Sequence, residues 1–154
     1  MTLTKKLIII FLIFLVTIQF FRPTKNLGVT EGPNHISAVV AIPENISLIL
    51  KTSCYDCHSN NTNYPWYSEI MPLGWWLNHH VQEGKAELNF SEFKLYSPKK
   101  QDRKLEETKE EVEGREMPLE SFTKIHKNAV LSEDQIKALS GWVDNSRKKI
   151  LLSK

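Results

Sequence analysis

Cys54, Cys57 and His58 lie within five positions of one another, and the chain of 154 residues has no other cysteine. Four arrangements would use such a cluster: a disulfide, one corner of a zinc site, a redox-active dithiol, or the attachment point of a covalently bound cofactor. Each of them ties the surrounding backbone to a different partner. The cluster therefore constrains the fold more than any other part of the sequence.

The residues around the cluster favour the attachment of haem. A zinc site needs four ligands, so His58 would have to recruit another histidine from a distant segment. A thioredoxin-like dithiol belongs to a βαβ setting that the sequence does not show, and a disulfide gives no reason for a histidine to follow at once. The order C-x-x-C-H matches c-type haem attachment, in which Cys54 and Cys57 each form a thioether with a vinyl group and His58 binds the iron. We therefore expect one covalent haem c per chain.

The first 21 residues carry a targeting or anchoring signal. Residues 7–21 have no charge, and Lys5 and Lys6 precede them. No small-residue cleavage site follows, and the stretch 3–21 is nineteen residues long, enough for a helix across a bilayer core of about 30 Å. We expect residues 1–21 to be an uncleaved transmembrane anchor, with a removed signal peptide as the alternative. With the two lysines inside, we expect the rest of the chain to lie on the outer side of the cytoplasmic membrane, in the periplasm or another extracytoplasmic space.

The remaining residues divide into a tether and one helical domain. Proline and glycine are frequent in residues 22–43, which we expect to form a flexible tether. Residues 44–150 are expected to form the domain. They hold four segments with helical features, at 43–53, 71–84, 97–114 and 131–150, and no convincing run of strict alternation. We therefore expect an all-α, cytochrome c-like domain around one haem, behind an N-terminal membrane helix.

Cap residues set the expected ends of these helices. Pro72 and Pro98 suit a first helical turn, and Gly84 and Gly114 suit a stop. Ser132 begins a capping box that Gln135 completes, and the apolar stripe behind it belongs in the core. The strongly charged segment 97–114 is expected to be a solvated face.

Met117 is expected to be the sixth ligand of the iron, opposite His58. It lies in a Met-Pro loop between two expected helices, and no apolar periodicity surrounds it. Core packing is the alternative role of this methionine. His79 and His80 compete for the same position, because they follow two tryptophans on an expected helix and one of the pair should face inward. The aromatic side chains expected to wall the haem pocket are Tyr64, Trp66, Tyr67, Trp75 and Trp76.

Charge and composition exclude some functions. The formal net charge is +2, and basic and acidic residues nearly balance beyond residue 44. A nucleic-acid binder needs a basic face that holds phosphates, and the sequence offers none. No nucleophile–base pair or acid–base dyad is evident, so we do not expect an enzyme.

Residues 44–147 resemble the small exported haem-binding domain family that is named for its C-x-x-C-H motif. The blocks Tyr-Pro-Trp-Tyr at 64–67 and Asn-Phe-Ser-Glu at 89–92 match in addition to the motif. The order of helix, C-x-x-C-H, Met-Pro loop and terminal helix is also similar to a single-haem cytochrome c. The resemblance implies thioethers at the two cysteines, His58 as the proximal ligand and Met117 as the distal one.

The sequence departs from the cytochrome c pattern in two places. Leu119 follows Met-Pro where a second proline is common, and the block 61–93 is not standard. The packing around the haem is therefore expected to differ.

Together these features predict a membrane-anchored monohaem c-type cytochrome that exchanges one electron at a time with redox partner proteins. The alternative is a haem peroxidase or a gas-binding or sensor protein with an open sixth position, in which His79 or His80 would act beside the iron. A third hypothesis, without haem, is an exported interaction domain held by a Cys54–Cys57 disulfide.

Overall fold

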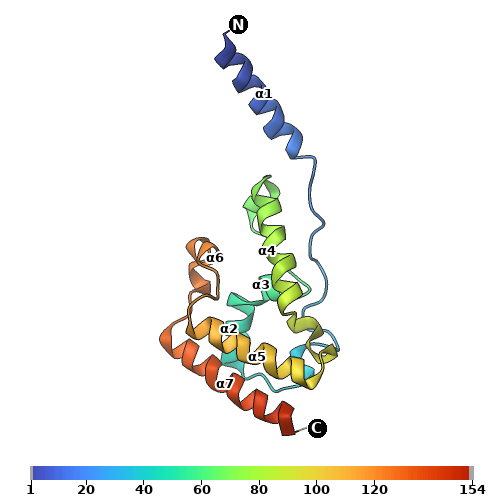
Figure 1. The fold of residues 1–154 in the computed structure, drawn as a ribbon, viewed down its shortest axis with the longest axis vertical. Coiled ribbons are helices and arrows are strands. Elements are labelled where there is room, and N and C mark those ends of the chain that lie inside the picture. Colours follow the sequence, from blue (N-terminus) through green and yellow to red (C-terminus); the bar gives the residue numbers. More distant parts are fainter. Residues whose placement is uncertain (1, 153–154) are drawn as a thin grey trace.

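The computed structural model of the protein describes residues 2–152, which contain helices and no β-strand (Figure 1). The α-helices are α1 (Leu3–Ile18), α2 (Glu44–Ser53), α3 (Tyr55–His58), α4 (Leu73–Glu87), α5 (Pro98–Glu113), α6 (Glu120–Ile125) and α7 (Glu133–Leu152). Short 3₁₀ helices are η1 (Ile36–Ala38), η2 (Trp66–Glu69), η3 (Phe90–Leu95) and η4 (Lys127–Ala129). The predicted all-α class is confirmed.

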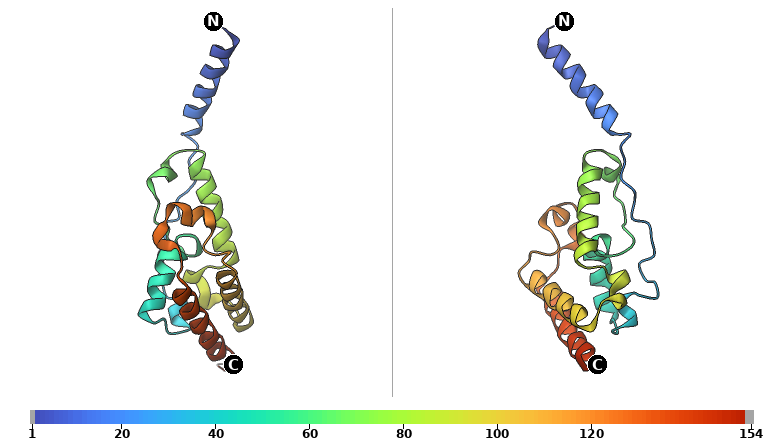
Figure 2. Two further views of the ribbon diagram at one scale, coloured as in Figure 1. Left: turned by 90° about the vertical axis from the view of Figure 1, so that its left-hand side faces the viewer. Right: turned by 45° about the vertical axis from the view of Figure 1, so that its right-hand side comes forward.

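Helices α5 and α7 lie side by side at one end of the molecule and carry much of its core (Figures 1 and 2). Leu105 of α5 and Leu139 and Val143 of α7 are fully buried between them and their neighbours. Phe90 and Phe93 of η3 complete the same cluster. Buried leucine and phenylalanine side chains each stabilise the fold by about 1.5–3 kcal/mol relative to exposed ones, so this end holds most of the apolar burial.

The cap residues behave largely as predicted. Ser97 caps α5 directly before Pro98, and the helix ends at Gly114. The capping box of α7 is formed in both directions, since the Ser132 hydroxyl accepts from the Gln135 amide at 3.2 Å and the Gln135 side-chain oxygen accepts from the Ser132 amide at 2.9 Å. These ends depend on local sequence alone, which is why they could be read from it.

Helix α1 is shorter than the predicted membrane helix. It ends at Ile18, and the next side chain, Gln19, bonds to the backbone of Met71 through both its amide nitrogen (3.0 Å to the carbonyl) and its oxygen (2.9 Å from the N–H). Within residues 2–152, no helix combines the length and the apolar character needed to cross a membrane. Most of the apolar side chains of α1 are exposed along its full length.

Residues 22–43, expected to be a flexible tether, instead run along the domain and contribute to it (Figures 1 and 2). Ile36 and Val40 are buried in the main core cluster. Leu27 pairs with Asn61 in an isolated β-bridge. A side chain at Gly28 would lie 2.8 Å from the Asn60 carbonyl oxygen, so this contact requires glycine. The folded unit therefore begins well before residue 44.

Candidate cofactor-binding site

The two cysteines and the histidine of the motif lie on a single helical turn. Helix α3 follows α2 almost without a break, since the Cys54 amide still bonds to the Leu50 carbonyl at 3.0 Å. The His58 amide donates to the Cys54 carbonyl at 2.9 Å. Side chains three and four positions apart face the same way on a helix. The backbone therefore presents Cys54, Cys57 and His58 on one side.

The loop after the motif holds this turn in place. The Asp56 carboxylate accepts from the Asn63 amide at 3.1 Å and from its side chain at 3.0 Å. The Thr62 hydroxyl donates to the Asp56 carbonyl at 2.6 Å. Hydrogen bonds to a carboxylate are stronger than those between neutral groups. The turn is thus fixed from its outer side, away from the motif side chains.

Gly84 allows α4 to pass directly against the motif. A Cβ at this position would lie 2.8 Å from the Cys57 carbonyl oxygen and 3.1 Å from the Cys57 Cβ. The sequence suggested Gly84 as a helix stop, which is wrong, because α4 continues to Glu87. The glycine serves close packing between two helices instead of ending one.

His58 is oriented by the end of α4. Its Nδ1 lies 3.0 Å from the Leu88 carbonyl oxygen, and a carbonyl can only accept, so Nδ1 carries the proton. Burial lowers the pKa of His58 from its usual value near 6.5. The ring is therefore neutral near pH 7, and Nε2 retains a lone pair. A histidine that ligates a metal in proteins typically has this second hydrogen bond.

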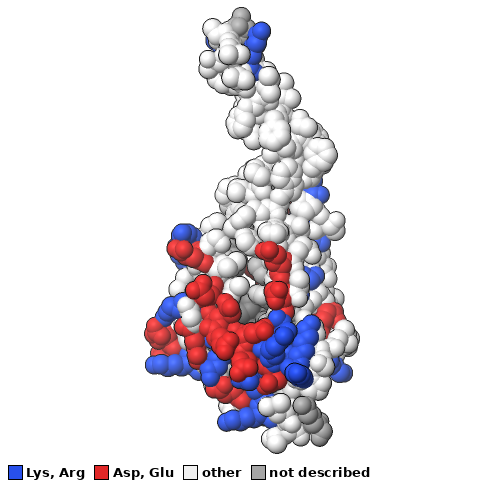
Figure 3. Space-filling view, viewed as in Figure 1, with Lys and Arg blue, Asp and Glu red and all other residues white. Residues whose placement is uncertain are grey.

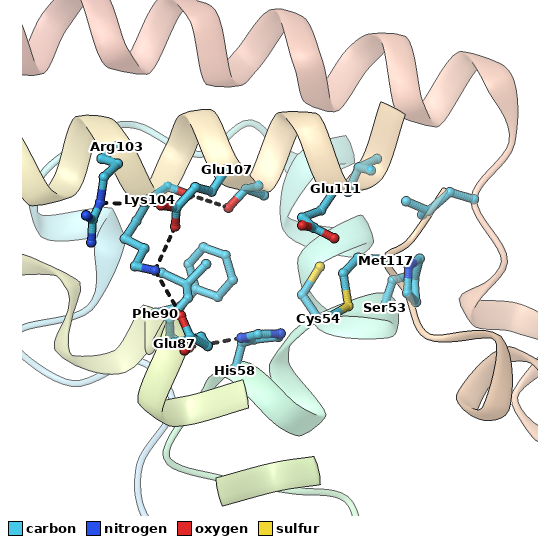
Figure 4. Close-up of a pocket in the computed structure, with 15 residues that line it drawn as sticks. Ser53, Cys54, His58, Glu87, Phe90, Arg103, Lys104, Glu107, Glu111 and Met117 are labelled. Carbon is cyan, nitrogen blue, oxygen red and sulfur yellow. Dashed lines mark hydrogen bonds and ion pairs between the residues drawn. The ribbon is translucent and has the colours of Figure 1, made fainter. Parts of the chain in front are cut away.

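Two adjoining cavities lie at the motif, and Figure 4 shows the larger of them. The larger has a volume of about 490 Å³ and the smaller about 270 Å³. Their lining residues overlap at Ser53, Cys54, His58, Glu87, Met117 and Pro118. Cofactor sites in proteins are largely apolar pockets of about 300–1,000 Å³, so the combined space is in the range that a cofactor needs.

Met117 lines both cavities together with Cys54 and His58. Its loop turns sharply at Arg115, which has a φ of 60°, and the Met117 amide is bonded to the Glu111 carbonyl at 3.1 Å. Figure 4 shows the Cys54 thiol and the Met117 thioether close together at the same cavity as the His58 ring. Met117 also packs partly against the main core cluster, so it has both of the roles considered for it.

All four residues expected to bind the cofactor are therefore brought together. Cys57 is the fourth, and it lines the smaller cavity. Helices α4 and α5 separate Met117 from the three motif residues in the sequence, so the tertiary fold brings Met117 to them.

The two cysteines are free thiols in this structure. Burial raises the pKa of Cys54 to about 12 and that of Cys57 to about 11. A redox-active dithiol needs a lowered thiol pKa, so these cysteines lack the electrostatic setting of one. Among residues 2–152, no group of three or more His, Cys, Asp or Glu side chains is placed to hold a metal ion.

The two adjacent histidines of α4 differ in their surroundings. His79 is exposed and lies 3.1 Å from the Glu83 carboxylate. His80 lines the smaller cavity and contacts the Trp76 ring edge-on at 4.6 Å between centroids. The expectation that one of the pair faces inward thus holds for His80. His35 is buried elsewhere, with its Nε2 3.0 Å from the Tyr55 hydroxyl.

The expected aromatic wall is not part of the cavities. Tyr64, Trp66, Tyr67, Trp75 and Trp76 are all absent from the residues that line them. Trp66, Trp75 and Trp76 are exposed, Trp66 by 78%, whereas Tyr67 packs with Leu77 and Val81 of α4 in a small cluster that Tyr64 and Cys57 join. Apolar walls come instead from Leu88, Phe90, Val112, Leu119, Phe122 and Leu131.

Helix α5 was expected to be only a solvated face, and the structure gives it a second role. Arg103, Lys104, Glu107, Thr108 and Glu111 line the larger cavity. Gln101, Lys104, Leu105 and Val112 are buried. The sequence shows Leu105 and Val112 as a sparse apolar seam on this helix, whereas Gln101 and Lys104 are polar and gave no sign of their burial.

Comparison with protein families gives one match. The model of a family described as a haem-binding domain matches residues 13–145, which cover most of the chain and include every residue of the cavity. Neither a comparison with curated proteins nor one with solved structures gives a match.

Proposed function

The chain belongs to the family of haem-binding domains, and we propose that it carries one haem c on its C-x-x-C-H motif and transfers single electrons. The observation that carries the proposal is the convergence of Cys54, Cys57, His58 and Met117 on two adjoining cavities. The residues fit a haem, because they supply two thiols on one face, an imidazole with a free nitrogen and an apolar surround. The spacing C-x-x-C-H is the pattern at which c-type haem is attached.

Each motif residue has a distinct part in this proposal. Cys54 and Cys57 would hold the haem through thioethers to its two vinyl groups. His58 would offer Nε2 to the iron while the Leu88 carbonyl holds its other nitrogen. Met117 would offer its thioether to the same iron. A haem held in this way would supply one-electron transfer, at a higher potential than one held by two histidines.

The test is a visible absorption spectrum of the full-length chain, exported in a strain that attaches c-type haem. Sharp low-spin bands on reduction, with colour that survives acid–acetone extraction, are expected. Cys54→Ala with Cys57→Ala should lose the covalent link. A colourless wild-type protein would contradict the proposal and favour a disulfide-held interaction domain.

A haem peroxidase or a gas-binding protein is the second candidate. The observation that favours it is His80, which lines the smaller cavity with Glu83 beside it and is placed to assist acid–base chemistry. Replacing Met117 with alanine separates the two functions. Loss of the low-spin spectrum supports the electron carrier, whereas a wild-type protein that is high-spin and binds carbon monoxide rapidly supports the alternative.

We also propose that α1 holds the domain at the outer face of the cytoplasmic membrane, where redox partner proteins meet it. Sixteen residues form a helix of about 24 Å, and its apolar surface continues onto the neighbouring end of the domain. The exposed residues there are Trp66, Ile70, Leu73, Trp75 and Trp76. Tryptophan is enriched where proteins meet the membrane interface. Exporting residues 22–154 behind a cleavable signal tests this, because the truncated domain should leave the membrane fraction.

A further inference from the structure

Arg103 and Lys104 are the only lysine or arginine side chains among the described residues that line the two cavities. Both belong to α5 and are neighbours in sequence. They lie at the larger cavity with Glu87 and Phe90, while Cys54 and Met117 lie at its other side (Figure 4). The cavity thus has a sulfur-rich side and a charged side, and the haem proposal so far uses only the first.

Lys104 is unusually buried for a lysine. Its side chain is 9% exposed, and its ammonium lies 3.2 Å from the Glu87 carboxylate and 2.7 Å from that of Glu107. A lysine ammonium has three N–H donors, and these two carboxylates account for two of them. A buried ammonium is costly unless it is paired, so the site is built to keep a cation at the cavity wall.

Arg103 shares one of these partners. Its Nε lies 3.3 Å from Glu107, and its side chain is 63% exposed. Arginine carries five N–H donors in a planar fork that matches a carboxylate, and this contact uses one of them. Glu87 is 79% exposed, so water can solvate its carboxylate if another anion replaces it at Lys104.

A haem brings two carboxylates of its own. Placing them in a cavity is unfavourable unless cations or hydrogen-bond donors meet them, and this cavity has two cations on one wall. We infer that Lys104 and Arg103 bind the two propionate carboxylates of the haem, with Glu87 and Glu107 holding the cations in position beforehand. The inference rests on the proposed haem binding and adds the residues that recognise the acidic edge of the group.

The test compares haemin with haemin dimethyl ester, in which both carboxylates are blocked. Each is titrated into the full-length chain produced without haem attachment, and the dissociation constants are measured from absorption changes. Wild-type chain should bind haemin more tightly than the ester. Lys104→Gln and Arg103→Gln should each weaken haemin binding about tenfold, as expected for the loss of one charge-assisted contact, and leave ester binding unchanged.

Lys109→Gln is the matched control. Lys109 lies on the same helix but pairs with Asp144 of α7 at 2.9 Å and does not line either cavity, so this change should affect neither compound. Arg103 is mostly exposed, so its variant is expected to fold even if replacement of the buried lysine disturbs the helix. Equal binding of haemin and ester by the wild type would overturn the inference. Failure of the wild type to bind either compound would overturn the inference as well, whereas the haem proposal is tested separately by the spectrum of the exported chain.

Discussion

The two ends of the molecule differ in where they direct their apolar side chains. At the end that holds α1, η2 and the start of α4, large apolar residues face outward, and almost none of the visible surface carries a charge (Figure 3). At the end that holds α5 and α7, lysine, arginine, aspartate and glutamate cover the outside while the apolar residues face one another. The first arrangement suits binding to an apolar surface, and the second suits folding in water.

Truncating one aromatic residue at each end should give the largest contrast. Phe93→Ala removes a fully buried ring of the core and should lower the free energy of unfolding by about 3–5 kcal/mol. Trp66→Ala removes a ring that is 78% exposed and should change it by less than about 0.5 kcal/mol. Urea unfolding measures both. Comparable losses for the two variants would mean that the outward-facing end is also part of the core.

Replacing one glycine in each of two helices, Gly84 of α4 and Gly141 of α7, tests how closely each helix packs. Gly84→Ala places a methyl group against the backbone of Cys57 and should cost about 1–3 kcal/mol, together with a changed haem spectrum. Gly141→Ala on α7 meets nothing within 4 Å and should stabilise the protein by roughly 0.5–1 kcal/mol, because alanine favours the helix. If both changes were neutral, α4 and the motif would not be closely packed.

Removing the α7 cap should have a moderate effect. Ser132→Ala leaves the Gln135 amide without its acceptor and should lower stability by about 1 kcal/mol. Thr123→Ala in α6 is a suitable reference, since its hydroxyl donates only to carbonyls of its own helix. Thermal unfolding followed by circular dichroism measures the stability of both variants, and Ser132→Ala should lose more than Thr123→Ala.

The smallest effect is expected for the ion pairs on the charged end. Arg147 of α7 lies 2.8 Å from Asp102 and 3.0 Å from Glu106 of α5, with 23% of its side chain exposed. Arg147→Gln should cost no more than about 1 kcal/mol in dilute buffer. The difference should shrink in 1 M salt, which screens charges beyond about 3 Å. A loss that is large and independent of salt would show that packing of the arginine stem matters more than its charge.

Local features of this fold could be predicted from the sequence. The ends of α5 and the capping box of α7 depend on residues within a few positions of one another, and so does the arrangement of Cys54, Cys57 and His58 on one turn. The convergence of Met117 with them was predicted from its poor fit to a core helix. Met117 lines the same cavity as Cys54 and His58, together with residues of α5.

Features that depend on distant contacts were missed. Residues 22–43 are rich in proline and glycine, as a tether would be, yet Ile36 and Val40 pack against a core assembled from later segments. Glycine commonly ends a helix, so Gly84 was read as a helix end. Its role follows instead from the close packing of Cys57, which lies on another helix. The aromatic residues after the motif were assigned to the pocket because such side chains suit a haem-pocket wall, but Tyr64 and Tyr67 pack in a small separate cluster and the tryptophans are exposed.

The joint between α1 and the domain determines how the cofactor would meet other proteins. Gln19 bonds to the Met71 backbone, Trp75 donates to the Phe21 carbonyl, and Arg22 pairs with Glu69. With its end bonded in this way, α1 cannot swivel freely against the cavities. If a membrane holds α1 as proposed, the domain diffuses in the plane of the membrane and keeps a fixed tilt relative to it. The cavities would then stand at a constant height above the membrane surface.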